Sequence, residues 1–397
     1  MNEPHATSST LPGALRWIDD ELQTLDRDQL RRFRREVIPQ TGARCLVDGR
    51  ELLNFASNDY LDLAGDLRVV SAAQQALADS GAGSRASALV CGRTRWHARL
   101  EKRLAEFEQQ AAAVLFPSGF AANMGTICAL AGRNDTLFSD RLNHASLIDG
   151  CRLSGAKTTI YEHGNLSGLH DALKQAPVGG RKLIVTDSVF SMDGDLAPLP
   201  ELCNLAERFG AMLLVDEAHA TGVFGAEGRG VAELQEVEHR VAVRVGTLSK
   251  AVGTLGGFVA GPHVLIDWLW NRGRPQVFST ALPPAVCAAA EKSIEIIETE
   301  PDRRQRLLQR AAELRSRLAS AGVATVQHAT GPIVPVILQT PGRAVQVAQE
   351  LERAGFLVGA IRPPTVPAGT SRLRITLSCG HTAADVKRLA DSLTTSL

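Results

Sequence analysis

In the segment LLVDEAHATG, from Leu213 to Gly222, an aspartate and a histidine follow an apolar run, and this arrangement indicates the class of fold. The run is continuously apolar rather than alternating, which is typical of a parallel strand covered on both faces. In sheets of parallel strands, ligands bind beyond the carboxyl ends of the strands. We therefore predict that Asp216 and His219 lie at the ligand-binding edge of an α/β sheet.

Similar short apolar runs alternate with longer amphipathic segments along the chain. The predicted buried strands span residues 112–116, 135–140, 182–187, 211–219 and 242–247. Between them, residues 199–210 read as a helix that a glycine ends. This alternation of strands and helices predicts an α/β architecture with a mostly parallel sheet.

The last quarter of the chain has a different pattern. Residues 301–322 read as a long, charged amphipathic helix, and apolar runs over 331–339 and 371–378 flank a further helix. We predict a small α+β domain here. The expected organisation is an N-terminal segment over residues 1–53, a large domain over 54–285 and the α+β domain over 286–397.

Composition narrows the class of protein. The chain has 397 residues, with 43 Lys plus Arg against 43 Asp plus Glu, so no polybasic surface for nucleic acid or membrane is expected. Seven cysteines without a CxxC pair argue against disulfide scaffolding and against a metal site. No leader pattern and no apolar run of roughly 20 residues is present. We expect a cytoplasmic protein.

A lysine follows the next predicted strand along the chain. The segment VGTLSKAVGTLGG, residues 245–257, carries Thr247, Ser249 and Lys250. With Asp216 and His219, it brings a carboxylate, an imidazole, two hydroxyls and an amine to one edge. Pyridoxal 5'-phosphate (PLP) requires this set, because its aldehyde forms a Schiff base with lysine and its ring nitrogen pairs with a carboxylate. The lysine is reactive only if burial or a neighbouring cation lowers its pKa.

A phosphate site is indicated by FPSGFAANMGT, residues 116–126. Here a strand ends, Ser118, Gly119 and Phe120 form a turn, and a helix begins. The free amides at a helix N-terminus bind anions, and glycine lets the backbone approach them closely.

Each of these residues also has a purely structural interpretation. Lys250 could be a solvated loop lysine, and Asp216 could cap a helix. His219 and His144 could be packed structural histidines. The segment at residues 116–126 could simply begin a helix.

Taken together, the motifs resemble those of the α-oxoamine synthase family of fold-type I PLP-dependent enzymes. The resemblance runs from about Asn54 to the C-terminus and is carried by NFASNDYLDL, SGFAAN, DRLNHASLIDG, VTDSVFSMDGDLAPL, VDEAHATGVFGAEGRG, GTLSKAVGTLGG and IRPPTVPAGTSRLRITLS. One departure is Ser249, where several relatives have glycine before the lysine. The resemblance implies a PLP transferase with a mostly parallel seven-stranded sheet, a small C-terminal α+β domain and an active site at a homodimer interface.

The resemblance also implies roles for individual residues around the cofactor ring. Lys250 would form the Schiff base and remove the α-proton of the bound amino acid, and Asp216 would pair with the ring nitrogen. His219 would bond to the phenolic oxygen. His144 would stack on the ring and meet the substrate, and Ser191 would contact the cofactor from a neighbouring turn.

The remaining implied contacts concern the phosphate and the substrates. The amides of Gly119 and Phe120 and the Thr247 hydroxyl would hold the phosphate, with Ser279 and Thr280 reaching it from the partner subunit. The expected substrate-binding residues are Arg374 for the amino-acid carboxylate, and Thr365 and Arg32 for the acyl substrate. Arg374 could instead be a surface-paired strand residue, Arg362 is an equally attractive anion binder, and a solvated helix face could explain Arg32.

The reaction that the resemblance implies is a decarboxylative condensation in biotin synthesis. L-Alanine would react with a pimeloyl thioester, carried by coenzyme A or by an acyl carrier protein. The segment RPPTVPAGTSRLR, residues 362–374, favours this acyl donor, although 5-aminolevulinate synthases keep a similar PTVP. The alternatives are a glycine-using relative, such as a 2-amino-3-ketobutyrate CoA ligase or a 5-aminolevulinate synthase, and a PLP-binding protein without turnover.

Overall fold

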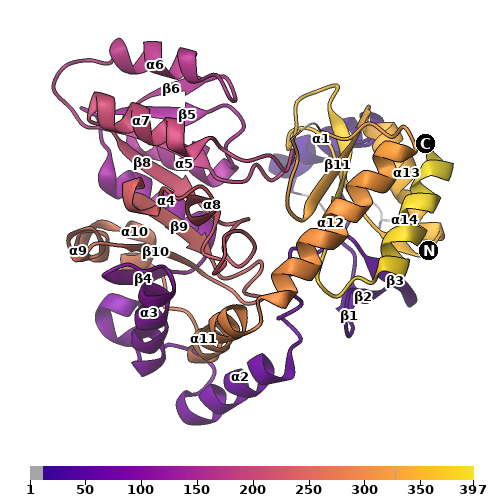
Figure 1. Cartoon of the computed structure of the whole chain (residues 1–397), viewed down its shortest axis with the longest axis horizontal. Helices are drawn as coiled ribbons and strands as arrows, with labels where there is room; N and C mark the ends of the chain where they lie inside the picture. Colours follow the sequence, from indigo (N-terminus) through magenta and orange to yellow (C-terminus); the bar gives the residue numbers. More distant parts are fainter. Residues whose placement is uncertain (1–11, 327) are drawn as a thin grey trace.

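The computed structural model describes residues 12–326 and 328–397, which form a larger and a smaller lobe (Figure 1). The larger lobe is built on a seven-stranded sheet in the order β4-β10-β9-β8-β7-β5-β6. All neighbouring strands are parallel except β10, which runs antiparallel to both β4 and β9. The strands are β4 (Ala112–Phe116), β5 (Thr136–Asp140), β6 (Lys157–Tyr161), β7 (Lys182–Asp187), β8 (Met212–Asp216), β9 (Val243–Thr247) and β10 (Gly257–Gly261). The predicted mostly parallel seven-stranded sheet is confirmed.

The sequence located five of these strands and missed two. The prediction over 211–219 was too long, because β8 ends at Asp216, whose own carboxylate accepts a hydrogen bond from the amide of Ala218 and starts a turn. β6 is a largely exposed edge strand, so its apolar signal is weak. β10 begins and ends with glycine, and glycine weakens a strand pattern.

Both faces of this sheet are covered by helices, as the continuous apolar runs indicate. In β8, Leu213 and Val215 pack into one apolar cluster while Leu214 packs into another on the opposite face. The helices of this lobe are α2 (Leu67–Ser80), α3 (Arg95–Phe107), α4 (Gly119–Leu130), α5 (Ala145–Ser154), α6 (Leu166–Lys174), α7 (Leu199–Phe209), α8 (Val231–Leu234), α9 (His263–Arg272), α10 (Arg274–Phe278) and α11 (Pro284–Thr299), with short turns η2 (Ala88–Gly92) and η3 (Glu238–Arg240).

The smaller lobe combines the two ends of the described chain (Figure 1). Its antiparallel sheet has the order β11-β14-β13, and a second sheet has the order β1-β2-β3-β12. In the second sheet, β3 pairs in parallel with β12, so residues near the N-terminus join the C-terminal part. Its elements are η1 (Gly13–Leu15), α1 (Arg16–Arg27), β1 (Val37–Pro39), β2 (Arg44–Val47), β3 (Arg50–Asn54), α12 (Asp302–Ser320), β11 (Ile333–Gln339), α13 (Pro341–Arg353), β12 (Phe356–Leu357), β13 (Gly359–Ile361), β14 (Ser371–Thr376) and α14 (Ala383–Ser396).

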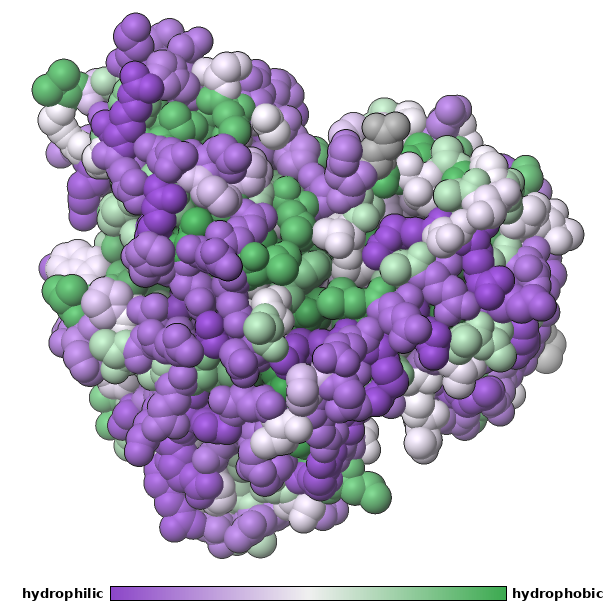
Figure 2. All heavy atoms as spheres, in the orientation of Figure 1, coloured by the Kyte–Doolittle hydropathy of each residue, from purple (hydrophilic) through white to green (hydrophobic). Residues whose placement is uncertain are grey.

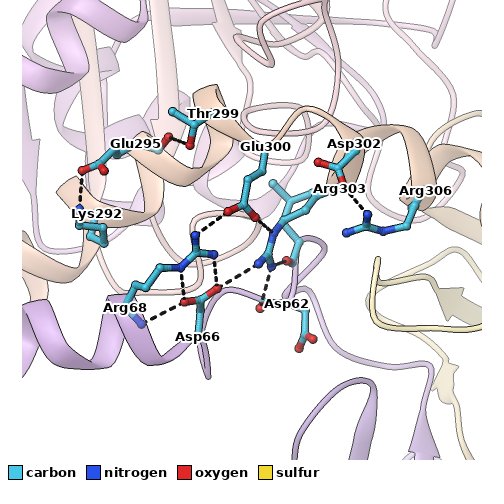
Figure 3. A network of polar contacts seen from close by, with 11 residues as sticks. Asp62, Asp66, Arg68, Lys292, Glu295, Thr299, Glu300, Asp302, Arg303 and Arg306 are labelled. Carbon is cyan, nitrogen blue, oxygen red and sulfur yellow. Dashed lines mark hydrogen bonds and ion pairs between the residues drawn. The ribbon is translucent and has the colours of Figure 1, made fainter.

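An ion-pair network lies at the junction of the two lobes, where α11 gives way to α12 (Figure 3). Arg303 donates to Glu300 at 2.8 Å, to Asp66 at 3.0 Å and to the carbonyl of Leu61 at 2.9 Å. Arg68 bonds to both Asp66 and Glu300, and the hydrogen bond from Arg68 holds the pKa of Asp66 at about 2. The network therefore ties residues 61–68 to the junction.

Figure 2 shows a mostly hydrophilic face, with apolar side chains gathered where the two lobes meet. Within the described ranges, no helix is long and apolar enough to cross a bilayer.

Candidate active site

Asp216, the last residue of β8, is held by two donors at the carboxyl edge of the sheet. Its Oδ2 accepts a 2.6 Å hydrogen bond from Nδ2 of Asn123 on α4, and its Oδ1 accepts one of 2.8 Å from the amide of Ala218. The side chain is only 4% exposed. Asp216 thus closes a turn rather than capping a helix, and it presents a fixed carboxylate at the predicted edge.

Lys250 lies three residues beyond the end of β9, the strand next to β8. Burial lowers the pKa of its ammonium group to about 8, although the carboxylates of Asp216 and Asp187 oppose this shift. The amine has no hydrogen-bond partner within residues 12–326 and 328–397. Lys250 is half-buried and lies in a loop, so it is not a fully solvated lysine.

Asp187 is a second buried carboxyl group at this edge, and no sequence motif predicted a role for it. It ends β7 and lies in register beside Asp216. Its Oδ2 accepts a 2.6 Å hydrogen bond from the backbone amide of His144. Burial and then the charge of Asp216 raise the pKa of Asp187 well above its usual range. The sequence feature that could have indicated a functional role is the position of Asp187 at the end of the predicted strand 182–187.

His219 is paired with a tyrosine from a distant part of the chain. Nδ1 of His219 lies 2.6 Å from the hydroxyl of Tyr60, and both side chains are buried. Burial and then the positive charges of Lys250 and Arg374 lower the pKa of His219 well below its usual range. The imidazole is therefore neutral. With Tyr60 as the donor over this short distance, we assign the ring proton to Nε2.

His144 lies between β5 and α5 and caps that helix. Its Nδ1 lies 2.7 Å from Oγ of Ser146 and accepts from the Ser146 amide. Its ring meets that of Phe120 edge-on, with the centroids 6.3 Å apart. His144 therefore has a structural role as a cap, and it also lies beside the predicted phosphate loop.

The predicted phosphate loop forms a narrow cradle. α4 begins at Gly119 after the N-cap Ser118, so the amides of Gly119 and Phe120 have no acceptor within the helix. A Cβ on Gly119 would lie 3.0 Å from Oγ1 of Thr247. The Thr247 hydroxyl is itself 2.8 Å from Oγ of Ser249. The start of α4 thus lies beside the Thr247 and Ser249 hydroxyls, and such amides and hydroxyls can bind a phosphate.

Arg374 reaches the same edge from β14 of the smaller lobe. Its Nε donates to the carbonyl of Ser191 at 2.6 Å, and its Nη1 donates to Oδ1 of Asn58 at 3.1 Å. The residue is 8% exposed, so the interpretation of Arg374 as a surface-paired residue is wrong. Its charge lowers the pKa of both Lys250 and His219, which places the guanidinium near them.

The two residues predicted for the acyl substrate lie beside each other. Nη2 of Arg32 is 3.5 Å from Oγ1 of Thr365, and both residues are exposed. α1 ends at Arg27, so a helix face does not explain Arg32. Arg362 donates to the carbonyl of Gln29 at 2.6 Å, which ties it to the segment before Arg32.

Ser279 and Thr280 directly follow α10. Thr280 pairs with Ser87 through an isolated bridge and is exposed. Their contact with a partner subunit stays a prediction.

Known proteins similar to this chain identify its family. The sequence profile of the aminotransferase class I and II family matches residues 50–393. An 8-amino-7-oxononanoate synthase from Anaeromyxobacter dehalogenans is 51% identical over 374 residues, which cover 94% of each chain. The chain belongs to the 8-amino-7-oxononanoate synthase family.

Solved structures share the fold of this 8-amino-7-oxononanoate synthase family member. A serine palmitoyltransferase from S. paucimobilis with bound PLP and myriocin is 32% identical, with a TM-score of 0.92 and 98% of each chain covered. An 8-amino-7-oxononanoate synthase from Francisella tularensis is 28% identical, with a TM-score of 0.76, covering 87% of this chain and 97% of that one. The predicted fold class, a fold-type I PLP transferase, is confirmed.

Proposed function

We propose that the protein condenses L-alanine with a pimeloyl thioester to give 8-amino-7-oxononanoate, carbon dioxide and a free thiol, in biotin biosynthesis. The observation that carries this proposal is a half-buried lysine of lowered pKa, which feels the charge of the fixed carboxylate of Asp216. The 51% identity to an 8-amino-7-oxononanoate synthase supports the choice of reaction.

The residues at the sheet edge fit PLP. When bound, PLP supplies an electron-withdrawing ring that stabilises negative charge on the α-carbon of an amino acid. The cradle at Gly119 leaves little room for a side chain and offers amide and hydroxyl donors that a phosphate needs. Lys250 would carry the covalent attachment. Asp216, fixed by Asn123, would accept a hydrogen bond from the ring nitrogen.

Lys250 would carry out the proton transfer. With a pKa of about 8, a useful fraction of its amine is neutral near neutral pH and can remove the α-proton of alanine. The neutral ring of His219 carries a proton on Nε2, which it would donate to the phenolic oxygen of the cofactor. His144 would stack on the cofactor and meet the substrate, and Ser191 would contact the cofactor from its turn.

Substrate binding would involve both lobes. Arg374 would bind the carboxylate of alanine through Nη2, because hydrogen bonds from a charged guanidinium to a carboxylate are strong. Ser191 and Asn58 hold its other nitrogens in place. Arg32 and Thr365, which lie together, would contact the pimeloyl thioester.

We further propose a homodimer in which Ser279 and Thr280 reach the partner's phosphate. Largely exposed apolar side chains support a covered surface here: Val90 on η2 is 77% exposed, Phe278 on α10 is 72% exposed, and the two segments are in contact.

We propose a cytoplasmic location, because the seven cysteines are all free thiols, which fits the reducing cytoplasm. The proposed division is an N-terminal segment over residues 1–53, a large domain over 54–285 and a C-terminal domain over 286–397, whose first helix, α11, packs back against α2 and α3 of the larger lobe.

The experiment combines site mapping with a comparison of substrates. Borohydride reduction of the PLP-loaded protein, followed by peptide mapping, should place the label on Lys250. The protein is then assayed with L-alanine or glycine, and with pimeloyl-CoA or a pimeloyl acyl carrier protein, following thiol release and product mass. A preference for glycine would indicate a sister enzyme. Substrate binding without thiol release would indicate a protein without turnover, and a label elsewhere would refute the proposal.

A further inference from the structure

His163 bridges two carboxylates with its two ring nitrogens. It lies between β6 and α6, where Nδ1 is 3.1 Å from Oδ1 of Asp140 and Nε2 is 2.7 Å from Oδ2 of Asp195. The Asp140 side chain is 5% exposed, and that of Asp195 is 18% exposed. The ring also meets Phe190 edge-on, with the centroids 4.3 Å apart.

This geometry fixes the charge of the ring. An ionised carboxylate only accepts hydrogen bonds, so both nitrogens of His163 must donate, and only an imidazolium does so. The two carboxylates accordingly raise the pKa of His163 to about 10, although burial opposes the shift. His163 is thus a cation at neutral pH, unlike His219.

Asp140 shapes the turn that carries His144. Its Oδ1 accepts a 2.8 Å hydrogen bond from the amide of Leu142, while Oδ1 and Oδ2 both face His163. Two residues further on, the amide of His144 donates to Asp187 at 2.6 Å. The position of Asp140 therefore sets where this turn delivers the His144 ring.

Asp195 closes the turn that carries Ser191. Its carbonyl accepts a 3.1 Å hydrogen bond from the amide of Phe190. Between these residues, the carbonyl of Ser191 accepts from Nε of Arg374, and the carbonyl of Met192 accepts from Arg372. The turn between Phe190 and Asp195 thus orients Arg374 through the carbonyl of Ser191.

We propose that His163 is a positioning residue, a cationic cross-link between Asp140 and Asp195 that fixes the His144 turn against the Ser191 turn and thereby orients Arg374. The inference rests on the proposed function for the role of Arg374 in binding alanine. His163 itself contacts none of Lys250, Asp216 and His219 in any hydrogen bond of the described residues.

The test replaces His163 with glutamine in the PLP-loaded enzyme. His170→Gln is the matched control, because His170 also lies beside a carboxylate, Asp171, and edge-on to a phenylalanine, but joins no turns. We expect His163→Gln to raise KM for L-alanine roughly tenfold, more than it lowers kcat, since small displacements of a binding group are costly. The circular dichroism of bound PLP should change as well, and His170→Gln should alter neither.

A second variant, Asp195→Asn, removes one end of the bridge while leaving the histidine in place. If loss of the cross-link causes the rise in KM for L-alanine, Asp195→Asn also raises this KM. The double variant then has a KM no higher than that of His163→Gln alone. It also replaces His163→Gln as the test should that variant fail to fold.

Unchanged KM and unchanged PLP dichroism in folded His163→Gln would overturn the proposal, as would strictly additive effects in the double variant. The assay of the wild-type enzyme distinguishes a failure of the proposed function from a failure of the proposed cross-link. A wild type that does not condense alanine refutes the proposed function, whereas the dichroism and the binding of L-alanine still report on the cross-link.

Discussion

The hydroxyl of Tyr60 and Nδ1 of His219 form a 2.6 Å hydrogen bond between two buried residues 159 positions apart. The carbonyl of Tyr60 also accepts a hydrogen bond from the amide of Cys379 in the smaller lobe, at 2.9 Å. Tyr60 therefore connects the smaller lobe to the turn that follows β8. It also fixes the tautomer of His219, on which the proposed bond from Nε2 to the cofactor depends.

Tyr60→Phe tests this bond. The change leaves a buried imidazole nitrogen without its partner, which typically costs about 1–3 kcal/mol of unfolding free energy. We also expect kcat to fall, because the tautomer of His219 is no longer fixed. Urea unfolding and steady-state kinetics measure the two effects. Tyr161→Phe is the control, because the buried Tyr161 hydroxyl makes at most a weak interaction with Thr186; equal losses in both variants would contradict the assignment.

The reactivity of Lys250 should depend on pH around its lowered pKa. Below about pH 8 the amine is protonated and cannot attack the aldehyde, and above it the amine is neutral. The rate at which the apoprotein forms a borohydride-trapped bond to PLP should therefore rise with pH and level off above about 8. A midpoint near 10.5, the ordinary value for lysine, would show that burial does not lower the pKa of Lys250.

Asp216→Asn should move that midpoint downward. The carboxylate of Asp216 raises the pKa of Lys250, so replacing it with a neutral amide leaves the lowering effect of burial less opposed. The same trapping experiment gives the direction of the shift. Condensing activity should fall by roughly 10²-fold or more, because the ring nitrogen loses its anionic partner. An upward shift of the midpoint would contradict the electrostatic account.

Gly119→Ala should weaken PLP binding. The added Cβ would lie 3.0 Å from Oγ1 and 3.1 Å from Cβ of Thr247, within the proposed phosphate cradle. We expect the Kd for PLP to rise roughly tenfold, which corresponds to about 1.4 kcal/mol. Gly132→Ala is the control, since a Cβ there meets nothing within 4 Å. Titration of the apoprotein with PLP compares the two variants, and equal affinities would argue against a cradle at Gly119.

Arg303→Ala should destabilise the junction between the lobes. Arg303 bonds to two carboxylates and to the carbonyl of Leu61, and its side chain is 15% exposed. Losing these bonds should lower the unfolding free energy by about 1–3 kcal/mol. Arg306→Ala, one turn further along α12, breaks only an exposed pair with Asp302 and should cost about 0–1 kcal/mol. Urea unfolding of both variants checks the difference, and equal losses would contradict the role of the network.

Much of the fold and part of the site follow from the sequence by itself. Continuous apolar runs predict five of the seven strands, and the polar residues that end or follow them include Asp216, His219, Thr247 and Lys250. The glycine at 119 likewise marks the start of α4. These features are local, because strand burial, helix capping and strand-end position depend on neighbouring residues in the chain.

Contacts between residues far apart in the chain could be found only in the folded structure. Arg374 and Ser191 are 183 positions apart, and Arg32 and Thr365 are 333 apart, yet each pair is in contact. The pairing of β3 with β12 and the reversed direction of β10 also depend on tertiary packing. The physical reason is that such contacts depend on how whole elements pack and close their shared core, which no local pattern of side chains specifies.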